Sequence, residues 1–372
     1  MFAVDNKRNI VASHFRPLPV KEVRKETEDC VSVAFDVPEA WQEEFQFKQG
    51  QNITIRMQMN GEEIRRSYSI CSSPLDHELR IAVKKVPQGK FSSFANIELA
   101  KNDILEVLPP TGRFYTPLDP SRQKNYLAFA AGSGITPVIS IIKTTLAMEP
   151  RSNFTLVYSN RNRSSIIFKE QLEALKNKYM ARFSLHYLLS REKTDAPIYH
   201  GRIDEKKCAA LFEKIPALKN TDEYFICGPE QMIFTVKQWL EGQNIDKNKI
   251  HFELFTVPGQ KINNAAGVPI EHKHAEEKIS NISVKLDGIS FEFDLPYDGL
   301  PILDAALQQG ADLPFSCKGG VCATCRARLL EGKVQMDNNY ALEPEELEAG
   351  FILTCQSHPR TEKVRIDFDV RG

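Results

Sequence analysis

Short runs in which apolar and polar residues alternate fill the first third of the chain. The runs 52–57 and 79–83 each place every second residue on an apolar face, which is typical of strands with one buried side. Glycine and proline separate such runs, for example at Gly50, Gly61 and the Pro109-Pro110 pair. Several short strands with frequent turns predict a small β-barrel or sandwich for residues 1–118.

The pattern changes near Asp119, where strands begin to alternate with helices. A continuous apolar strand is predicted over 126–131, and the helix that follows carries Val138, Ile141 and Ile142 on one stripe. We expect three further strands at 154–158, 183–189 and 224–227, and a helix at 168–178. Such alternation predicts a parallel sheet with crossover helices for residues 119–257.

A polar stretch follows and is predicted to be a linker over 258–280. Its two histidines, His272 and His274, fit either solvated linker side chains or metal ligands. From Asn281 onward, apolar and polar residues alternate on both sides of an Asp-Gly pair at 287–288, which predicts a β-hairpin. We therefore expect a third domain over 281–372.

Composition narrows the function classes. The chain has 372 residues, 42% of them hydrophobic and 26% charged, with a formal net charge of -1. There is no basic excess, so we expect no nucleic-acid partner. No apolar run approaches the ~20 residues that a membrane helix needs, and the first residues lack a signal-peptide core. We therefore expect a cytoplasmic protein with reduced cysteines.

Four of the eight cysteines crowd into the last fifth of the chain. Their spacing is Cys317-x4-Cys322-x2-Cys325, with Cys355 farther on, which matches the plant-type pattern of [2Fe–2S] ligands. Two irons need four thiolates, and the small residues Gly319 and Gly320 let the backbone approach a cluster closely. Structural zinc is the alternative, although zinc sites usually pair all four cysteines at short spacing. The other cysteines divide into Cys227, discussed below, and a set with no expected chemistry: Cys30, Cys71 and Cys208.

The segments around the first and fourth ligands support a specific resemblance. Pro314-Phe315-Ser316-Cys317 and Thr354-Cys355-Gln356 resemble the entry to the cluster loop and the fourth ligand of plant-type ferredoxins. The resemblance covers residues 281–372 and implies an α+β (β-grasp) fold.

Two glycine-containing turns follow predicted parallel strands. The first, Gly132-Ser133-Gly134-Ile135-Thr136-Pro137, lies between strand and helix, with Thr136 expected as the N-cap and Pro137 as the first helical residue. The second, Cys227-Gly228-Pro229, ends another strand. Helix amino termini and the carboxyl ends of parallel strands favour phosphate-bearing ligands, although a plain βα turn or a buried cysteine also explains each motif.

Together these turns resemble the NAD(P) half of the ferredoxin–NADP reductase family. The resemblance implies that the first turn, through Gly132, Gly134, Thr136 and Pro137, holds the pyrophosphate. It places Cys227, Gly228 and Pro229 beside the nicotinamide. Ser159, Arg161 and Arg163 would bind the adenosine end, where cations favour NADPH, with NADH left open.

The barrel carries the matching flavin motif, Arg66-Ser67-Tyr68-Ser69-Ile70. The family resemblance implies that Arg66 pairs with flavin phosphate, Tyr68 stacks on the ring and Ser69 reaches the reactive nitrogen, with Ile70 completing the segment. An edge strand is the structural alternative. A second flavin-phosphate segment is implied by a similar match, and its residues are Lys84, Val86, Gly89, Ser92 and Ser93.

Two details qualify the flavin half. Gln88-Gly89 replaces a glycine pair that many family members show, which leaves FMN open beside the expected FAD. Glu253-Leu254-Phe255 resembles the stretch that closes the nucleotide domain near the flavin, and it equally fits a last strand. Ser69, Cys227 and Glu253 are the residues expected at the reaction centre.

Nearly the whole chain therefore resembles reductases of multicomponent oxygenases, with nothing specific contributed by residues 1–25 and the linker. The implied fold is an antiparallel β-barrel flavin domain, an α/β parallel-sheet nucleotide domain and a β-grasp ferredoxin domain. Electrons would pass from NAD(P)H through FAD and a [2Fe–2S] cluster to an oxygenase component or another acceptor protein. The alternatives are a general electron-transfer reductase and a non-redox module stabilised by zinc.

Overall fold

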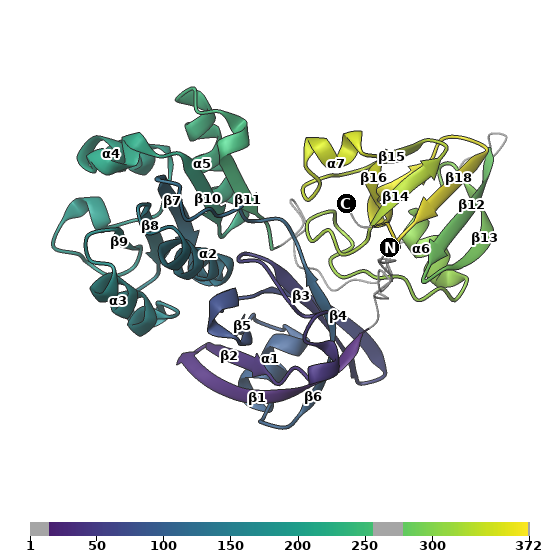
Figure 1. Ribbon diagram of the computed structural model, residues 1–372, viewed down its shortest axis with the longest axis horizontal. Helices are drawn as coiled ribbons and strands as arrows, with labels where there is room; N and C mark the ends of the chain where they lie inside the picture. The colour runs from purple at the N-terminus through teal and green to yellow at the C-terminus, as the bar shows by residue number, and fades with distance from the viewer. Residues whose placement is uncertain (1–14, 256–277, 371–372) are drawn as a thin grey trace, which may run out of the picture. The chain divides into compact units, whose positions relative to one another are not determined.

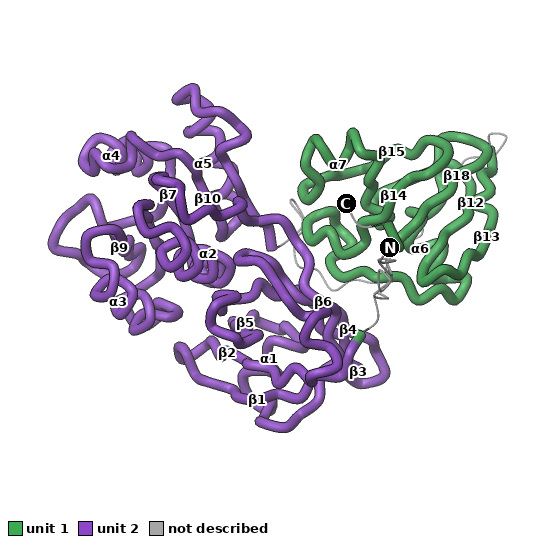
Figure 2. The backbone as a smooth tube through the Cα atoms, viewed as in Figure 1, with its two compact units in different colours: residues 1–15, 256–372 green, residues 16–255 purple. Residues whose placement is uncertain are grey.

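The computed structural model describes residues 15–255 and 278–370 (Figure 1). The chain forms two compact units, one of residues 16–255 and one that contains the C-terminal residues from 256 onward (Figure 2). Each unit is described by itself. Most of the predicted linker, with His272 and His274, lies outside the described residues.

The first part of residues 16–255 is a six-stranded antiparallel sheet. Its strand order is β4-β3-β6-β1-β2-β5, and an isolated antiparallel bridge between Ile70 and Ile81 joins the two ends, so the sheet closes into a barrel. The predicted antiparallel barrel is confirmed. Its strands are β1 (Arg16–Thr27), β2 (Cys30–Phe35), β3 (Asn52–Met59), β4 (Glu62–Ser69), β5 (Leu79–Lys84) and β6 (Ile104–Thr111).

The inward residues of these strands form the barrel core. Ile53, Ile55, Ile81 and Val107 are at most 1% exposed, which explains the period of two in the sequence. Helix α1 (Lys90–Ile97) adds Phe91 to the same core. Two short 3-10 helices, η1 (Glu39–Trp41) and η2 (Pro74–Asp76), lie in the connections.

The second part of this unit is a five-stranded parallel sheet in the order β11-β10-β7-β8-β9. All predicted strands are present. They are β7 (Asn125–Ala131), β8 (Asn153–Asn160), β9 (Phe183–Leu189), β10 (Glu223–Cys227) and β11 (Ile250–Glu253). The helices are α2 (Ile135–Met148), α3 (Lys169–Lys178), α4 (Glu205–Lys214) and α5 (Glu230–Gly242). Short 3-10 helices are η3 (Gly132–Gly134), η4 (Arg163–Ser165), η5 (Pro197–Tyr199), η6 (Pro216–Asn220) and η7 (Lys247–Lys249).

The start of α2 differs from the sequence prediction. Gly134 already has helical dihedral angles (φ -61°, ψ -7°) and is the N-cap, so Thr136 lies inside the first turn. Its hydroxyl donates to the carbonyl of Ser133 at 3.0 Å instead of accepting from the helix. The prediction of Thr136 as N-cap and of Pro137 as first helical residue was wrong, because the glycine turn itself winds into the helix.

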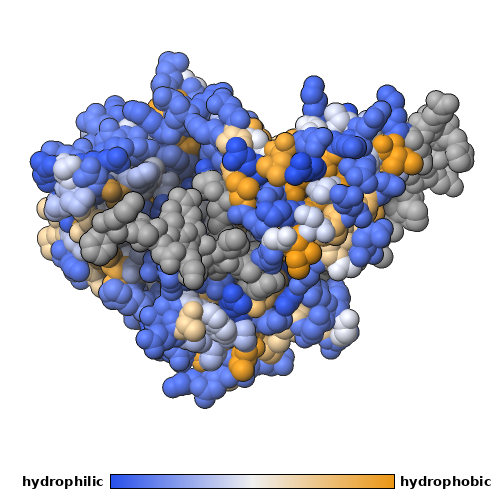
Figure 3. All heavy atoms as spheres, turned by 45° about the vertical axis from the view of Figure 1, so that its right-hand side comes forward, coloured by the Kyte–Doolittle hydropathy of each residue, from blue (hydrophilic) through white to orange (hydrophobic). Residues whose placement is uncertain are grey.

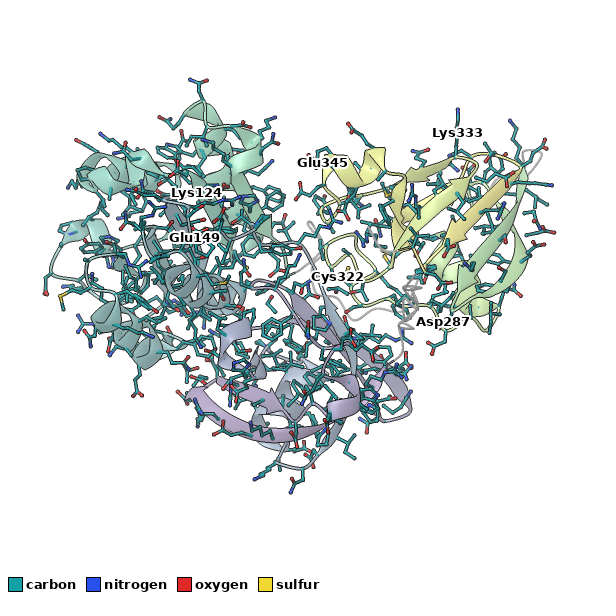
Figure 4. All side chains as sticks on the ribbon, viewed as in Figure 1. Lys124, Glu149, Asp287, Cys322, Lys333 and Glu345 are labelled. Atoms are coloured by element: carbon teal, nitrogen blue, oxygen red, sulfur yellow. The ribbon has the colours of Figure 1, made fainter. Side chains whose placement is uncertain are left out.

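Charged side chains tie together the amino-terminal ends of the parallel strands. Lys124 forms an ion pair with the carboxylate of Glu223, and His251 contacts the other oxygen of the same group at 3.0 Å. Glu149 is fully buried and accepts from Tyr126 at 2.9 Å (Figure 4 labels Lys124 and Glu149). These contacts satisfy buried polar groups and leave the opposite, carboxyl ends of the strands to carry a ligand.

Helix α2 also joins the parallel sheet to the barrel. Its Ser140 hydroxyl donates to the carbonyl of Ser72 at 2.6 Å, and the Thr144 hydroxyl lies 2.9 Å from the Ser73 hydroxyl. Ser140 and Thr144 are at most 1% exposed. The two halves of residues 16–255 are therefore fixed together by buried, directional hydrogen bonds.

The C-terminal unit has a five-stranded mixed sheet in the order β13-β12-β18-β14-β16, with β15 and β17 as a separate pair. The predicted hairpin is confirmed, with Asp287 (φ 54°) and Gly288 (φ 76°) in the turn between β12 and β13. The strands are β12 (Ile279–Leu286), β13 (Ile289–Pro296), β14 (Arg326–Glu331), β15 (Val334–Met336), β16 (Phe351–Leu353), β17 (Ser357–Pro359) and β18 (Lys363–Asp367). The helices are α6 (Ile302–Gln308), α7 (Pro344–Glu348) and the 3-10 turn η8 (Thr354–Gln356).

The surface shown in Figure 3 is mostly hydrophilic, with hydrophobic residues in separate groups. Exposed large hydrophobic side chains include Ile104, Met180 and Ile289. Among the described residues, none of the helices combines the length and apolar character that a membrane crossing requires.

Candidate functional site

Two of the predicted reaction-centre residues meet although they lie far apart in the chain. Ser69 ends strand β4 of the barrel, and Glu253 ends strand β11 of the parallel sheet. The Ser69 hydroxyl donates to Oε2 of Glu253 at 2.8 Å. The contact therefore joins the end of the flavin motif to the carboxyl edge of the parallel sheet.

The third residue, Cys227, lies beside Glu253. It ends β10 and pairs in register with Glu253 on one side and with Ala130 on the other. Burial raises the pKa of Glu253 to about 7, although the hydrogen bond from Ser69 lowers it in part. Burial also raises the pKa of the Cys227 thiol well above its usual value, and the charge of Glu253 adds to that effect. The site thus holds a neutral thiol next to a carboxyl group that titrates near neutrality.

The two predicted glycine turns touch at this edge. A Cβ on Gly134 would lie 2.1 Å from the carbonyl oxygen of Cys227, so only glycine fits there. A Cβ on Gly228 would lie 2.7 Å from Met232 and 3.1 Å from the Cβ of Ala131. Gly132, in contrast, has φ +54° and open space where its Cβ would be, which leaves room for a ligand above the turn. Pro229 is the N-cap of α5.

The flavin motif lies along β4. The side chain of Arg66 is exposed and donates to the carbonyl of Arg65 at 2.7 Å. Tyr68 is half-buried, and its ring centroid lies 5.5 Å from that of Phe91 on α1. Ile70 is fully buried, closes the barrel through its bridge to Ile81, and donates its N–H to the carbonyl of Gln51 at 2.8 Å. An exposed cation followed by an aromatic ring on the same face of a strand fits a phosphate-bearing ring cofactor.

The second flavin segment surrounds the start of α1. The Val86 N–H donates to the Ser92 hydroxyl at 3.1 Å, and that hydroxyl contacts the Gly89 carbonyl at 3.3 Å. Ser93 follows on the helix and is half-buried. Lys84 lies 3.5 Å from Asp29, so its charge is already shared with a carboxylate. The segment forms a tight turn whose helix amino terminus favours an anion.

The residues expected at the adenosine end follow β8. Ser159 is 9% exposed and lies near the end of that strand, while Arg161 and Arg163 lie on the loop that follows. Arg163 is held by Glu192, which accepts from its backbone N–H at 2.8 Å and lies 3.2 Å from its Nε. Arg163 is therefore the less available phosphate ligand of the two, because the Glu192 carboxylate competes for its guanidinium group.

The four cysteines of the C-terminal unit come together as two pairs. Cys317 and Cys322 lie in the loop between α6 and β14, where Figure 4 labels Cys322, and the Cys322 thiol acts on that of Cys317. Cys325, at the end of that loop, pairs likewise with Cys355 of η8. The pairs are neighbours, since the charge of Cys317 acts on Cys355.

Backbone N–H groups face the first pair. The contact with Cys322 lowers the pKa of Cys317 to about 6, helped by the N–H groups of Gly319 and Val321. The loop reaches this arrangement through left-handed backbone at Lys318 (φ 52°), Gly320 (φ 75°) and Ala323 (φ 54°).

This donor set fits a two-iron cluster, which needs two thiolates on each iron. Among residues 15–255 and 278–370, no group of three His, Cys, Asp or Glu side chains that could hold one metal ion is found.

Three residues that contribute to these sites received no role in the sequence analysis, although Gln356 belongs to the segment around the expected fourth ligand. Lys90 forms an ion pair with Glu62, and its hydrogen bond lowers the pKa of that carboxyl group. The positive charge of Arg66 lowers the same pKa further. Phe91 packs against Tyr68. Gln356 contacts the cluster loop. Lys90, Phe91 and Gln356 are all adjacent to predicted site residues in the sequence, but no spacing rule distinguishes them from their neighbours.

Family models match three segments of the chain. A 2Fe-2S iron-sulfur cluster binding domain model matches residues 284–360, an oxidoreductase NAD-binding domain model 129–238 and an oxidoreductase FAD-binding domain model 17–115. The predicted cofactor set of FAD, a nicotinamide nucleotide and a [2Fe–2S] cluster is thereby confirmed, as is the predicted order of the three domains.

Curated relatives align over nearly the full chain. One component of the 1,2-phenylacetyl-CoA epoxidase from Escherichia coli is 43% identical, covering 96% of this chain and 99% of that protein. The ferredoxin reductase component of 3-ketosteroid-9-alpha-monooxygenase from Rhodococcus rhodochrous is 36% identical over 94% and 96%. A solved structure, phthalate dioxygenase reductase, shares the fold with a TM-score of 0.56 and 24% identity, covering 95% and 98%.

Proposed function

The chain belongs to the family of oxygenase reductases with FAD-binding, NAD-binding and [2Fe–2S] domains, and we propose that it supplies electrons from NADPH to a phenylacetyl-CoA epoxidase. When bound, FAD accepts two electrons as a hydride and releases them singly, which matches a nicotinamide donor to a one-electron cluster. The loop Cys-Lys-Gly-Gly-Val-Cys-Ala-Thr-Cys, the domain order and the 43% identity over nearly the full chain support this acceptor.

The observation that carries the proposal is the contact between Ser69 and Glu253. Hydride transfer requires the flavin motif and the nicotinamide motif to meet. This 2.8 Å hydrogen bond ties the flavin motif to Glu253, which pairs in register with Cys227 of the nicotinamide motif. We propose that the Ser69 hydroxyl orients the flavin ring and that Glu253 holds or releases a proton at its carboxyl oxygen. Neutral, buried Cys227 would exclude water beside the nicotinamide.

The binding roles follow the same division. We propose that Arg66, Lys84, Val86, Gly89, Ser92 and Ser93 surround the flavin phosphates, with Tyr68 against the ring and Ile70 supporting it. Gly132, Gly134, Thr136 and Pro137 would hold the pyrophosphate of the nucleotide, with Gly228 and Pro229 at the nicotinamide. Cys317, Cys322, Cys325 and Cys355 would ligate the cluster.

We propose NADPH as the donor because Arg161 and Arg163 follow β8 beside Ser159. The ion pair between Arg163 and Glu192 makes Arg161 the stronger candidate for a 2′-phosphate. We expect Arg161→Ala to raise KM for NADPH by about tenfold while leaving KM for NADH within about twofold, since only NADPH carries that phosphate. Steady-state dye reduction with each nucleotide measures both values. An equal change for the two nucleotides would contradict NADPH recognition by Arg161.

The domain limits and the location are also proposals. We place the flavin domain at residues 1–118, the nucleotide domain at 119–257, the linker at 258–280 and the ferredoxin domain at 281–372. We propose a cytoplasmic location, because four cluster thiolates must stay reduced and all eight cysteines are free thiols.

Reconstitution tests the acceptor. The purified holoprotein is mixed with NADPH and the oxygenase subunits of a phenylacetyl-CoA epoxidase, and product formation is compared with that in a 3-ketosteroid monooxygenase system. We expect turnover that saturates with the epoxidase. Faster turnover with the other oxygenase would contradict the proposed acceptor while keeping the reductase function.

A further inference from the structure

The residue that follows the fourth cluster ligand contacts both sides of the cluster site. Gln356 is 7% exposed, and its Nε2 donates to the carbonyl of Lys318 at 3.0 Å and to that of Cys355 at 2.9 Å. The same nitrogen lies 3.7 Å from the sulfur of Cys355, within hydrogen-bond distance for a sulfur acceptor. One amide therefore connects the segment of the fourth ligand to the loop that carries the other three.

The surrounding groups determine which end of the amide faces the cluster. All three neighbours of Nε2 are acceptors, namely two carbonyl oxygens and a sulfur. On the other side, Nδ2 of Asn338 donates to Oε1 of Gln356 at 3.3 Å. A flipped amide would place its oxygen against three acceptors, so the NH2 end must face them. Its two hydrogens serve the two carbonyl oxygens, and the Cys355 sulfur shares one of them at the longer distance.

The space around Gln356 is tight. A Cβ on Gly320 would lie 3.2 Å from Cγ of Gln356 and 3.0 Å from the carbonyl oxygen of Asn338. Two backbone hydrogen bonds complete the enclosure, from the Tyr340 N–H to the Gly320 carbonyl at 3.0 Å and from the Asp337 N–H to the Gln356 carbonyl at 2.9 Å. The cluster loop is thus held from one side by Gln356 and the segment 337–340.

We propose that Gln356 is a positioning residue that raises the reduction potential of the bound cluster. Reduction adds negative charge, so donors that point at the ligand sulfurs stabilise the reduced state more than the oxidised one. Gln356 provides such a donor to Cys355. By holding the Lys318 carbonyl it also keeps the Gly319 N–H aimed at the Cys317 sulfur, 3.3 Å away. The inference rests on the four-cysteine cluster site of the proposed function.

The test compares Gln356→Met and Gln356→Glu with a control on strand β15, Gln335→Met. Gln335 is exposed, and its side-chain oxygen accepts from Arg360 outside the cluster site. Iron and sulfide are first measured in each holoprotein, and the cluster is then titrated redox-potentiometrically by visible absorbance and electron paramagnetic resonance. We expect the equilibrium constant for reduction of the cluster to be about 3- to 10-fold smaller in Gln356→Met, which lowers the one-electron reduction potential by ~30–60 mV. Gln356→Glu should shift it further, because a carboxylate opposes the added charge.

The outcomes distinguish failure of the inference from failure of the proposed function. A Gln356→Met protein that keeps its iron and matches Gln335→Met in potential and spectrum overturns the inference alone. If Gln356→Met loses iron that Gln335→Met retains, the role of Gln356 in holding the cluster loop is supported. The reduction potential of Asn338→Ala then tests whether Gln356 also raises the potential: a lower value supports this and an unchanged value overturns it. A wild-type protein that binds no iron and sulfide overturns the proposed function as well.

Discussion

The proposed reaction centre at Ser69 and the proposed cluster loop are built in opposite ways. Ser69 and Glu253 are 184 residues apart, and they meet only because a barrel and a parallel sheet pack together. Three of the four cysteines of the cluster site lie within nine consecutive residues, 317–325. Backbone N–H groups of the same loop point at the Cys317 thiol. The first site therefore depends on how the whole of residues 16–255 folds, and the second depends on local chain geometry.

This difference predicts separable failures. Substitutions in the cluster loop should stop electron transfer to a protein acceptor. They should leave NADPH oxidation intact, because the two sites share no side chain among the described residues. Damage at the strand ends should slow nucleotide oxidation and leave the cluster intact.

The largest effect is expected from Cys325→Ser. Cys325 is 2% exposed and pairs with Cys355, so its loss removes a buried ligand that no neighbour replaces. We expect loss of the cluster and an at least ~100-fold fall in oxygenase-coupled turnover, with NADPH-dependent ferricyanide reduction within about threefold of wild type. Cys208→Ser, a buried cysteine on α4, is the control. Loss of dye reduction with FAD still bound would contradict the separation of the sites.

Gly134→Ala should be next. Its Cβ would collide with the Cys227 carbonyl oxygen, so the strand end or the glycine turn must move. We expect a ~10- to 100-fold fall in NADPH oxidation rate, since small displacements of reacting groups are costly. Iron content should not change. Gly242→Ala is the matched control, because a Cβ there meets nothing within 4 Å. An equal effect of both variants, measured by dye reduction, would show that the contact has no special role.

Ser69→Ala should have a smaller effect. It removes the hydroxyl that donates to Glu253, a hydrogen bond whose loss corresponds to a ~3- to 10-fold slower hydride transfer. Because that bond lowers the pKa of Glu253, its loss should raise this pKa. The pH at which the hydride-transfer rate changes should therefore be higher in Ser69→Ala than in wild type. Ser67→Ala on the same strand is the control, since Ser67 contacts Thr54 instead. Rapid-mixing rates across pH measure both effects. Identical profiles for wild type and Ser69→Ala would contradict the role of Ser69.

The smallest effect concerns stability. The pKa of Glu253 is about 7 in the folded protein and 4.5 for an ordinary glutamate. The stabilisation that protonated Glu253 gives the folded state is therefore complete below pH 4.5 and is lost as the pH rises through 7. Glutamine cannot ionise, so Glu253→Gln should gain about 1–2 kcal/mol over wild type between roughly pH 5 and pH 8. Thermal melts at the two pH values test this, with exposed Glu39→Gln as the control. An equal difference at both pH values would contradict a raised pKa.

The same contrast explains what the sequence could predict. The four proposed cluster ligands were predicted from spacing, because three lie within nine consecutive residues and a distant fourth cysteine completes the plant-type pattern. Two barrel strands, at 52–57 and 79–83, were predicted from their period of two, and four strands of the parallel sheet from apolar runs that alternate with helices. The Asp287-Gly288 turn was predicted from residue type. These are local signals that tertiary packing does not reverse.

Contacts between distant segments could not be predicted from the sequence. Nothing in the composition of β4 or β11 says that Ser69 and Glu253 share a hydrogen bond, and only the family resemblance brought them together. The helix start at Gly134 was mispredicted because Thr136 has a favourable capping side chain, whereas the close approach of Cys227 fixes glycine at the cap. Gln356 was missed because its role depends on Asn338 and Gly320, which no motif connects.

We propose that hydride arrives where Ser69, Cys227 and Glu253 meet, and that electrons leave through the four-cysteine site. Anaerobic rapid mixing of the holoprotein with NADPH, followed at the absorbance bands of flavin and cluster, tests this order. We expect the flavin absorbance to fall first and the cluster absorbance to follow. Cluster absorbance that falls before the flavin band, or without it, would show that the proposed order is wrong.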